Sequence, residues 1–262
     1  MQVSLNDRIV LITGSAQGIG QSCARLAARS GAAGIMLTDR NDAAESMRLV
    51  AEDGHTHGTE VGFVEADLRD KDAPLHIAEA CLARFGRVDG LINAAGLTDR
   101  GSLAAATPAL WDMLFTVNAK APSFLMQHCI ADMTGRKAGG AIVNILSMNI
   151  HCGADDLAIY SASKAALALI TRNAAQAHRF DRIRVNGINV GWADTPGERL
   201  LYGTTLGKGD DWLSEQAALQ PFGRLLAPED VARLAIFLLS DSSLPMTGAL
   251  VDQEQWVIGG KN

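Results

Sequence analysis

The sequence predicts an α/β fold in which helices cover both faces of a mainly parallel sheet. Short β-rich apolar runs alternate with longer segments of helical periodicity, and the connections between them are short. Small, polar and acidic residues stand directly after the predicted strands, which in a parallel sheet all end at one edge. We therefore expect a ligand site along that carboxyl edge.

Length and composition are those of one globular domain. The chain has 262 residues, 48% of them hydrophobic and 20% charged, and a formal net charge of -6. We predict a single domain over residues 1–262, with no basic surface for nucleic acid. No apolar stretch reaches the ~18 residues of a membrane span, and the N-terminus lacks a basic start followed by an apolar segment. We expect a cytoplasmic protein with a small-molecule substrate.

Cysteines and histidines give no sign of a metal site. The four cysteines contain no CxxC pair, and His55 and His57 have no second group of ligands to complete a site. Neither a disulfide framework nor a bound metal is predicted.

The first unit is a strand, a glycine turn and a helix. The strand covers residues 9–13, the turn reads GSAQGIG, and the helix ends near residue 30. Glycines let the backbone approach a pyrophosphate, whose charge the unpaired N–H groups of the helix would stabilise. No lysine stands where a P-loop needs one, which argues against a Walker-type ATP site. The residues expected to hold the cofactor here are Gly14, Ser15, Gln17, Gly18, Ile19 and Gly20.

A second predicted strand, residues 35–38, ends in Asp39. An acidic side chain at this point can accept hydrogen bonds from both hydroxyls of an adenosine ribose and would repel a 2′-phosphate. Asp39 therefore favours NAD over NADP. Arg40 follows directly and would partly offset that repulsion, so the strictness of the preference stays open. The alternative is an ordinary solvated aspartate at a strand end.

The rest of the chain continues the alternation. Further strands are predicted over residues 61–65, 88–92, 141–146, 183–190 and 249–252, and further helices over residues 42–53, 70–85, 108–133, 160–180 and 228–239. Small or polar residues follow the strands at Asp67-Leu68, Asn93-Ala94-Ala95-Gly96, Ser147 and Gly191. Residues 195–219 break the pattern with four glycines, which favours a lid over the substrate; a plain surface loop is the alternative.

Residues 147–164, SMNIHCGADDLAIYSASK, hold the candidate catalytic group. Ser147 ends a predicted strand, Tyr160 opens a helix, and Lys164 lies one turn later on the same face. A neighbouring ammonium and a helix N-terminus both favour the phenolate, so we expect a Tyr160 pKa below the ~10 of a free phenol. The alternative is a surface Tyr–Lys pair. Asn118, a mediocre helix former in mid-helix, calls for a packing or chemical reason.

The ordered set of motifs resembles the short-chain dehydrogenase/reductase family, of the classical type, over nearly the whole chain. The matching residues are Thr13-Gly14-x-x-x-Gly18-x-Gly20, Asp67, Asn93-Ala94-Ala95-Gly96, Asn118, Ser147, Tyr160-x-x-x-Lys164, the Gly191 region and the strand after Thr247-Gly248. The resemblance implies one NAD(P)-binding Rossmann domain with a seven-stranded sheet, a nicotinamide cofactor and a homo-oligomer, often a tetramer.

The resemblance also implies roles for individual residues. Tyr160 would exchange a proton with the substrate oxygen, to which Ser147 would hydrogen-bond. Lys164 would hold the cofactor ribose, and Asn118 would anchor a water that relays the proton. Asp67 would approach adenine, Asn93 the adenosine ribose side and Thr195 the nicotinamide amide. Further cofactor contacts would come from Leu68, Ala94, Gly96 and Gly191.

Two departures from the family pattern stand out. Val190 occupies the place of a usual proline, which puts the local rigidity beneath the nicotinamide in doubt. Gln253 and Glu254 replace common glycines after the last strand, where they could close the pocket or reach a neighbouring subunit.

The residues that could line a substrate pocket are mostly polar. They are Ser147, Asn149, His151, Asp155, Trp192, Asp194 and Glu198. Several hydrogen-bonding groups suit a polyhydroxylated compound. We therefore predict NAD-dependent oxidation of a secondary alcohol or sugar hemiacetal in a sugar, polyol or similar substrate. Reduction of a 3-oxoacyl or other ketone is one alternative, and a catalytically idle cofactor-binding regulatory protein is another.

Overall fold

The computed structural model describes residues 3–209 and 211–259, and in this part of the chain seven parallel strands form one sheet. The strands are β1 (Ile9–Thr13), β2 (Gly34–Asp39), β3 (Glu60–Glu65), β4 (Gly90–Asn93), β5 (Gly140–Ile145), β6 (Ile183–Val190) and β7 (Leu250–Gln253). Their order across the sheet is β3-β2-β1-β4-β5-β6-β7, and every neighbouring pair is parallel. The predicted Rossmann-type fold is confirmed. The order reverses between β1 and β4, which is where such sheets bind ligands.

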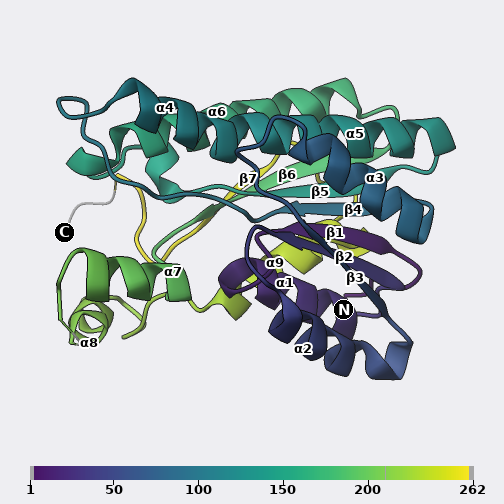
Figure 1. Cartoon of the computed structure of the whole chain (residues 1–262), viewed down its shortest axis with the longest axis horizontal. Coiled ribbons are helices and arrows are strands. Elements are labelled where there is room, and N and C mark those ends of the chain that lie inside the picture. Colours follow the sequence, from purple (N-terminus) through teal and green to yellow (C-terminus); the bar gives the residue numbers. More distant parts are fainter. Residues whose placement is uncertain (1–2, 210, 260–262) are drawn as a thin grey trace.

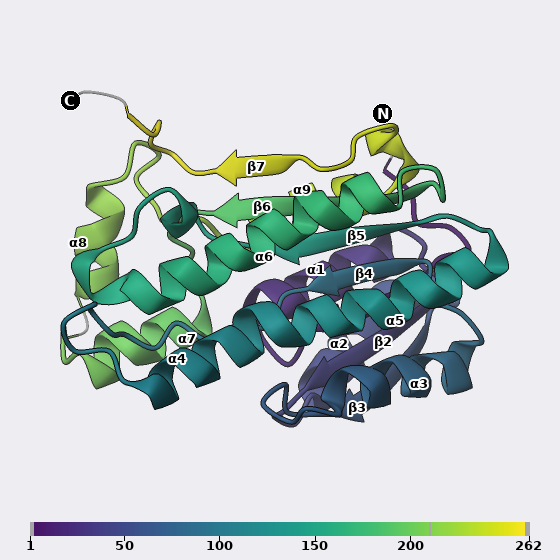
Figure 2. The same cartoon turned by 90° about the horizontal axis from the view of Figure 1, so that it is seen from above.

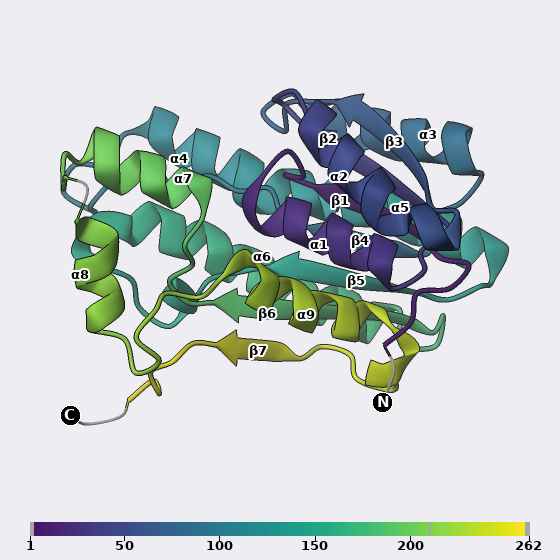
Figure 3. The same cartoon turned by 90° about the horizontal axis from the view of Figure 1, so that it is seen from below.

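Helices cover both faces of the sheet. One face carries α1 (Gly18–Arg29), α2 (Ala44–Gly54) and α9 (Pro228–Leu239), as Figures 1 and 3 show. The other face carries α3 (Ala73–Phe85), α4 (Pro108–Phe115), α5 (Ala121–Arg136) and α6 (Ala158–Ala177), which lie in front in Figure 2. Short 3₁₀ turns are His55–His57, Met148–Ile150, Asp155–Leu157 and Asp241–Ser243. Parallel strands require such crossover helices, so this layering follows from the alternation in the sequence.

Strand β1 shows how the two cores form. Val10 and Ile12 pack with α1 and α9, whereas Ile9 and Leu11 pack with α3, α5 and α6. All four side chains are buried, Ile9 being the most exposed at 7%. Successive side chains of a strand point to opposite faces, so a strand covered on both sides needs a continuous apolar run.

Two helices near the site differ from the prediction in a way that matters for it. The predicted helix over residues 108–133 is interrupted by a π-helical turn, Thr116–Lys120, which contains the buried Asn118. Single π turns inside helices are frequent at functional sites. Helix α6 begins at Ala158, two residues before the predicted start, so Tyr160 lies in its first turn.

The segment 195–219 is largely helical. It contains α7 (Pro196–Arg199), a π-helical segment (Leu200–Thr205) and α8 (Trp212–Ala218), and these helices lie beyond the carboxyl ends of the strands (Figures 1 and 3). The lid predicted over residues 195–219 stays a prediction. None of the helices in the described residues is long and apolar enough to cross a membrane. A homotetramer and a cytoplasmic location stay predictions.

Candidate active site

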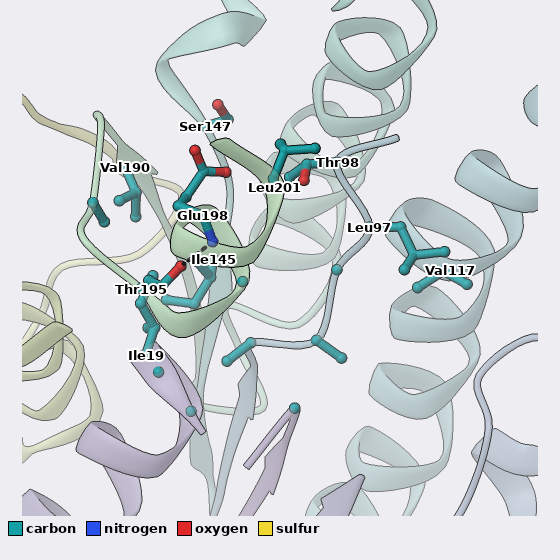
Figure 4. Close-up of a pocket in the computed structure, with 18 of the residues that line it drawn as sticks. Ile19, Leu97, Thr98, Val117, Ile145, Ser147, Val190, Thr195, Glu198 and Leu201 are labelled. Carbon is teal, nitrogen blue, oxygen red and sulfur yellow. Dashed lines mark hydrogen bonds between the residues drawn. The ribbon is translucent and has the colours of Figure 1, made fainter. Parts of the chain in front are cut away.

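A cavity of about 760 Å³ lies along the carboxyl edge of the sheet (Figure 4). Its walls come from the ends of β1, β2, β4, β5 and β6, from α6 and from the segment that follows β6. It brings together most of the residues predicted to bind a cofactor or substrate: Gly14, Gln17, Gly18, Ile19, Gly20, Asp39, Arg40, Asp67, Leu68, Ala94, Gly96, Ser147, Asn149, Tyr160, Lys164, Gly191, Trp192, Thr195 and Glu198.

The glycine turn after β1 admits no larger residue at two positions. Gly14 has φ +67°, and a Cβ there would lie 2.7 Å from the backbone N of Ala95. A Cβ on Gly20 would lie 2.2 Å from the carbonyl oxygen of Gly14. Among the described residues no side chain caps the N-terminus of α1 at Gln17, so its first N–H groups stay available for an anion. The turn fits the pyrophosphate of a dinucleotide.

Ser15 is a correction to the predicted set. The residue is fully buried, and its hydroxyl donates to the carbonyl oxygen of Thr38 at 3.2 Å. It therefore lies outside the cavity lining. Its side chain ties the turn to β2, which is a structural role.

At the opposite wall, Asp39 holds the glycine turn against the end of β2. One carboxylate oxygen accepts the N–H of Ala16 and the other accepts the N–H of Asn41, both at 3.0 Å. Nearby, Asp67 accepts from Arg69 Nε at 2.8 Å, and this pairing lowers the pKa of the Asp67 carboxyl. Two carboxylates and the exposed Arg40 thus belong to the cavity lining.

The side chain of Asn93 does not line the cavity, and the predicted approach of Asn93 to the adenosine ribose side of the cofactor stays a prediction. Asn93 stands opposite Asn144 in the register of β4 and β5, and its Nδ2 donates to Asn144 Oδ1 at 2.8 Å. The side chain is buried within the sheet layer. The cavity is lined instead by the residues after it, from Ala94 to Gly96.

Tyr160 and Ser147 meet at the cavity wall. Burial raises the pKa of Tyr160 to about 12, a hydrogen bond with Ser147 acts in the opposite direction, and the negative charge of Glu198 adds to the rise. The expectation of a lowered Tyr160 pKa is therefore wrong for this structure. Lys164 lies on the same helix face, but its ammonium donates to the carbonyl oxygen of Ile145 at 2.9 Å, and burial lowers its pKa to about 8. Burial outweighs the neighbouring cation.

Asn118 lies outside the cavity lining and is hydrogen-bonded to Leu97, a residue of the cavity wall. Its Oδ1 accepts the N–H of Leu97 at 2.9 Å, and its Nδ2 donates to the Leu97 carbonyl at 2.9 Å and to Ser163 Oγ at 3.0 Å. Both amide hydrogens are therefore used. These bonds join the segment after β4 to α6 and explain the polar residue in mid-helix. The predicted proton relay through a water on Asn118 stays a prediction.

Three of the predicted substrate residues lie outside the cavity lining. The exposed His151 bonds Asp252 Oδ1 through Nε2 at 3.1 Å, Asp155 is exposed at the start of a 3₁₀ turn, and Asp194 pairs with Arg199 at 2.6 Å. The prediction that they line the pocket is wrong, since each side chain turns outward to solvent or to an ionic partner. Within the described residues, no group of three His, Cys, Asp or Glu side chains could hold a metal ion.

Comparison with known proteins identifies the family. Residues 14–253 match the family described as Enoyl-(Acyl carrier protein) reductase. The chain is 33% identical to cis-4-hydroxycyclohexanecarboxylate dehydrogenase of Sinomonas cyclohexanicum, over 94% of each chain, and 33% identical to D-xylose 1-dehydrogenase of Caulobacter vibrioides, over 98% of this chain and 96% of that one. Its fold matches L-sorbose reductase of Gluconobacter frateurii, solved with NADPH and L-sorbose, with a TM-score of 0.91, 28% identity and 100% of both chains covered.

The chain belongs to the short-chain dehydrogenase/reductase family. Members of this family are oxidoreductases that bind a nicotinamide cofactor and act on alcohols and carbonyls. The glycine turn, Tyr160 and Lys164 described above all line the same cavity.

Glu254 packs against the end of β6, where Val190 stands in the position of the family's usual proline. Its carboxylate accepts the N–H of Trp192 at 3.3 Å, and a Cβ on Gly191 would lie 2.1 Å from its Oε2. Val190 stays paired with Gln253 in the sheet register. Among short-chain dehydrogenases/reductases a proline usually stiffens this point; here a carboxylate packed against Gly191 holds the turn and lines the cavity.

One group in the cavity wall was not predicted from the sequence. Arg100 donates from Nη1 to both oxygens of Asp156 at 2.7 Å and from Nη2 to the hydroxyl of Tyr202 at 2.9 Å. The Tyr202 ring stacks on Trp212 at a centroid distance of 4.9 Å. Three segments far apart in the chain meet here, so no local spacing could indicate the group.

Proposed function

We propose that this protein is an NAD-dependent dehydrogenase that oxidises a secondary alcohol or sugar hemiacetal in a sugar, polyol or similarly polar compound. The observation that carries the proposal is that Tyr160, Ser147 and Lys164 line the same cavity as the glycine turn. Asn149, Trp192 and Glu198 make that end of the cavity polar. The similarity to a D-xylose dehydrogenase and an L-sorbose reductase supports a polyhydroxylated substrate.

The cavity fits a nicotinamide dinucleotide along its length. The glycine turn and the N-terminus of α1 would bind the pyrophosphate, Asp39 the adenosine ribose, and Thr195 the amide of the nicotinamide. The cofactor supplies the hydride chemistry. The buried Lys164 would hold the second ribose from the floor of the cavity.

Tyr160 and Ser147 are the residues that accept the substrate proton and hold the substrate oxygen. In oxidation, the Tyr160 oxygen takes the proton of the substrate hydroxyl, while Ser147 Oγ holds the same oxygen by a hydrogen bond. Since the pKa of Tyr160 is about 12 here, the phenol keeps its proton at neutral pH, and oxidation should speed up as the pH rises. In the reverse direction the same phenol is a ready donor. Such acid–base help is worth ~10²- to 10⁴-fold in rate.

Asp39 supports NAD over NADP, because its carboxylate stands at the cavity wall beside the glycine turn. A 2′-phosphate placed there would meet a negative charge. The relative solved with NADPH and the neighbouring Arg40 make cofactor use the first quantity to measure.

Two other functions agree less well with the residues of the cavity. Reduction of a 3-oxoacyl or other less polar ketone would use the same Tyr160 as donor, but Glu198 and Asn149 give the cavity a polarity that such substrates do not need. A catalytically idle binding protein would have no use for a buried Tyr160 paired with Ser147.

The test is a screen of sugars, polyols and ring alcohols with NAD and with NADP, read by the absorbance of the reduced cofactor. Tyr160→Phe should lose at least ~10²-fold in turnover while still binding NAD in a fluorescence titration. Trp111→Phe, an exposed aromatic residue of α4 outside the cavity lining, is the control and should retain the wild-type turnover. Undiminished turnover in Tyr160→Phe would refute the mechanism, and no oxidation of any alcohol with either cofactor would refute the function.

A further inference from the structure

Glu198 is held with its carboxylate directed into the cavity. Its backbone N–H donates to Thr195 Oγ1 at 3.2 Å, shown dashed in Figure 4, which fixes the first turn of α7. Its Oε2 accepts the indole N–H of Trp192 at 3.0 Å. Its other oxygen, Oε1, accepts no hydrogen bond from the described residues and remains an acceptor on the cavity side. Figure 4 shows the carboxylate pointing toward the Ser147 side of the cavity.

Glu198 lines the same cavity as Ser147 and Tyr160. Burial raises the pKa of the Glu198 carboxyl, while the hydrogen bond from Trp192 and the charge of Arg100 act in the opposite direction. Its negative charge in turn contributes to the raised pKa of Tyr160. When the reacting hydroxyl of a substrate reaches Tyr160, the substituents on the neighbouring carbons therefore lie near Glu198.

The other charges at this end do not neutralise that carboxylate. Asp99 and Glu254 also line the cavity. Arg100 is paired through both oxygens of Asp156, and the buried Lys164 ammonium donates to a backbone carbonyl. The substrate end of the cavity therefore presents acceptors and negative charge.

We infer that Glu198 is the residue that selects the substrate: it accepts a hydrogen bond from a hydroxyl next to the reacting carbon and excludes substrates that carry a carboxylate. The chemical class is then an uncharged compound with neighbouring hydroxyls, such as a neutral sugar or a cyclic diol. This inference rests on the proposed function and narrows it. A hydrogen bond to a charged acceptor contributes more binding free energy than one to a neutral acceptor, so a substrate without the donor hydroxyl loses more. A carboxylate on the substrate would in addition be repelled by the negative charge.

The experiment compares three probes on the wild-type protein: the most active uncharged diol of the screen, its analogue without the neighbouring hydroxyl, and its analogue with a carboxylate. For D-galactose these are 2-deoxy-D-galactose and D-galacturonate. We expect kcat/KM for the deoxy analogue to be lower by about 10- to 100-fold, the size of a hydrogen bond to a charged group. The carboxylate analogue should be turned over still more slowly.

Glu198→Gln keeps the shape and an acceptor for Trp192 but removes the charge. The preference for the diol over the deoxy analogue should fall below about tenfold, the range of a neutral hydrogen bond, and turnover of the carboxylate analogue should rise. The pH at which oxidation reaches half its maximum should also move down, because a negative charge that raises the pKa of Tyr160 is gone. Glu215→Gln, an exposed residue of α8 in the same lid segment, is the matched control and should change none of the three.

The outcomes separate the inference from the function on which it rests. A wild-type protein that oxidises no alcohol of the screen with either cofactor refutes the proposed function, and one that oxidises other alcohols but none of the diols refutes only the inference. A wild-type protein that oxidises the diol, together with a Glu198→Gln variant that keeps the same discrimination against both analogues, refutes only the inference. Equal wild-type turnover of the galactose and the galacturonate would refute it as well.

Discussion

Replacing Asp39 by asparagine should remove most of the preference for NAD. In the structure both carboxylate oxygens already accept a backbone N–H, from Ala16 and from Asn41, each at 3.0 Å. These two bonds fix the carboxylate at the wall of the cavity. Each oxygen retains a further lone pair for a ribose hydroxyl. Asparagine keeps the shape of the side chain but has no charge and only one acceptor oxygen.

The size of the effect follows from this geometry. A hydrogen bond from a ribose hydroxyl to a charged acceptor is worth about 1.5–3 kcal/mol, which is roughly 10- to 150-fold in affinity. The variant also loses the charge that opposes a 2′-phosphate, so NADP should bind no worse than before. One of the two backbone N–H groups would face the new amide NH₂, which costs about 1–3 kcal/mol in local stability. The ratio of kcat/KM for NAD to that for NADP should fall at least tenfold.

The assay measures kcat/KM with both cofactors at one saturating alcohol concentration. Asp42→Asn is the control, since Asp42 is exposed, lies outside the cavity lining and accepts only the N–H of Ala44 at 3.0 Å. Its cofactor ratio should stay within about twofold. An unchanged ratio in Asp39→Asn, or a wild-type protein that prefers NADP, would show that Asp39 does not select the cofactor.

Two further variants test how the fold supports the site. Arg184→Met should lower the free energy of unfolding, measured in urea, by about 2–4 kcal/mol. The reason is that the buried Arg184 guanidinium donates to three carbonyls at the end of α9, which would lose their donor. As the control, the exposed Arg172→Met should change the free energy of unfolding by under about 0.5 kcal/mol. Gly14→Ala should cost about 2–4 kcal/mol and weaken NAD binding, since it combines a positive φ with a contact at 2.7 Å to Ala95. Gly58→Ala, with φ +68° and nothing within 4 Å of the added Cβ, should cost only about 1–2 kcal/mol; equal losses in the two glycine variants would contradict the close approach of backbone at Gly14.

Local patterns in the chain were sufficient to predict the fold and the frame of the site. Strand β1 is a continuous apolar run followed by glycines, and both features act over neighbouring residues only. Tyr160 and Lys164 share a face because they lie one helical turn apart. Asp39 stands at the cavity because parallel strands end at one edge.

The direction and environment of side chains were decided by tertiary contacts. Asn93 turns away from the cavity because its partner across the sheet is Asn144, a residue on another strand. Tyr160 has a raised pKa because helices and loops bury it, which no i,i+4 spacing can express. The outward turn of His151 depends on Asp252, a residue of the last strand.

The chain by itself therefore determined the sheet, the glycine turn and the placing of Tyr160 and Lys164 on one helix face, since these depend on periodicity and on groups a few residues apart. Only the tertiary structure decided what surrounds the substrate. Arg100, Asp156 and Tyr202 meet from three segments. Glu198 faces the reacting end because Trp192 and Thr195 hold it there. Long-range contacts of this kind depend on how the loops pack at the end of the sheet, which local spacing in the sequence does not express.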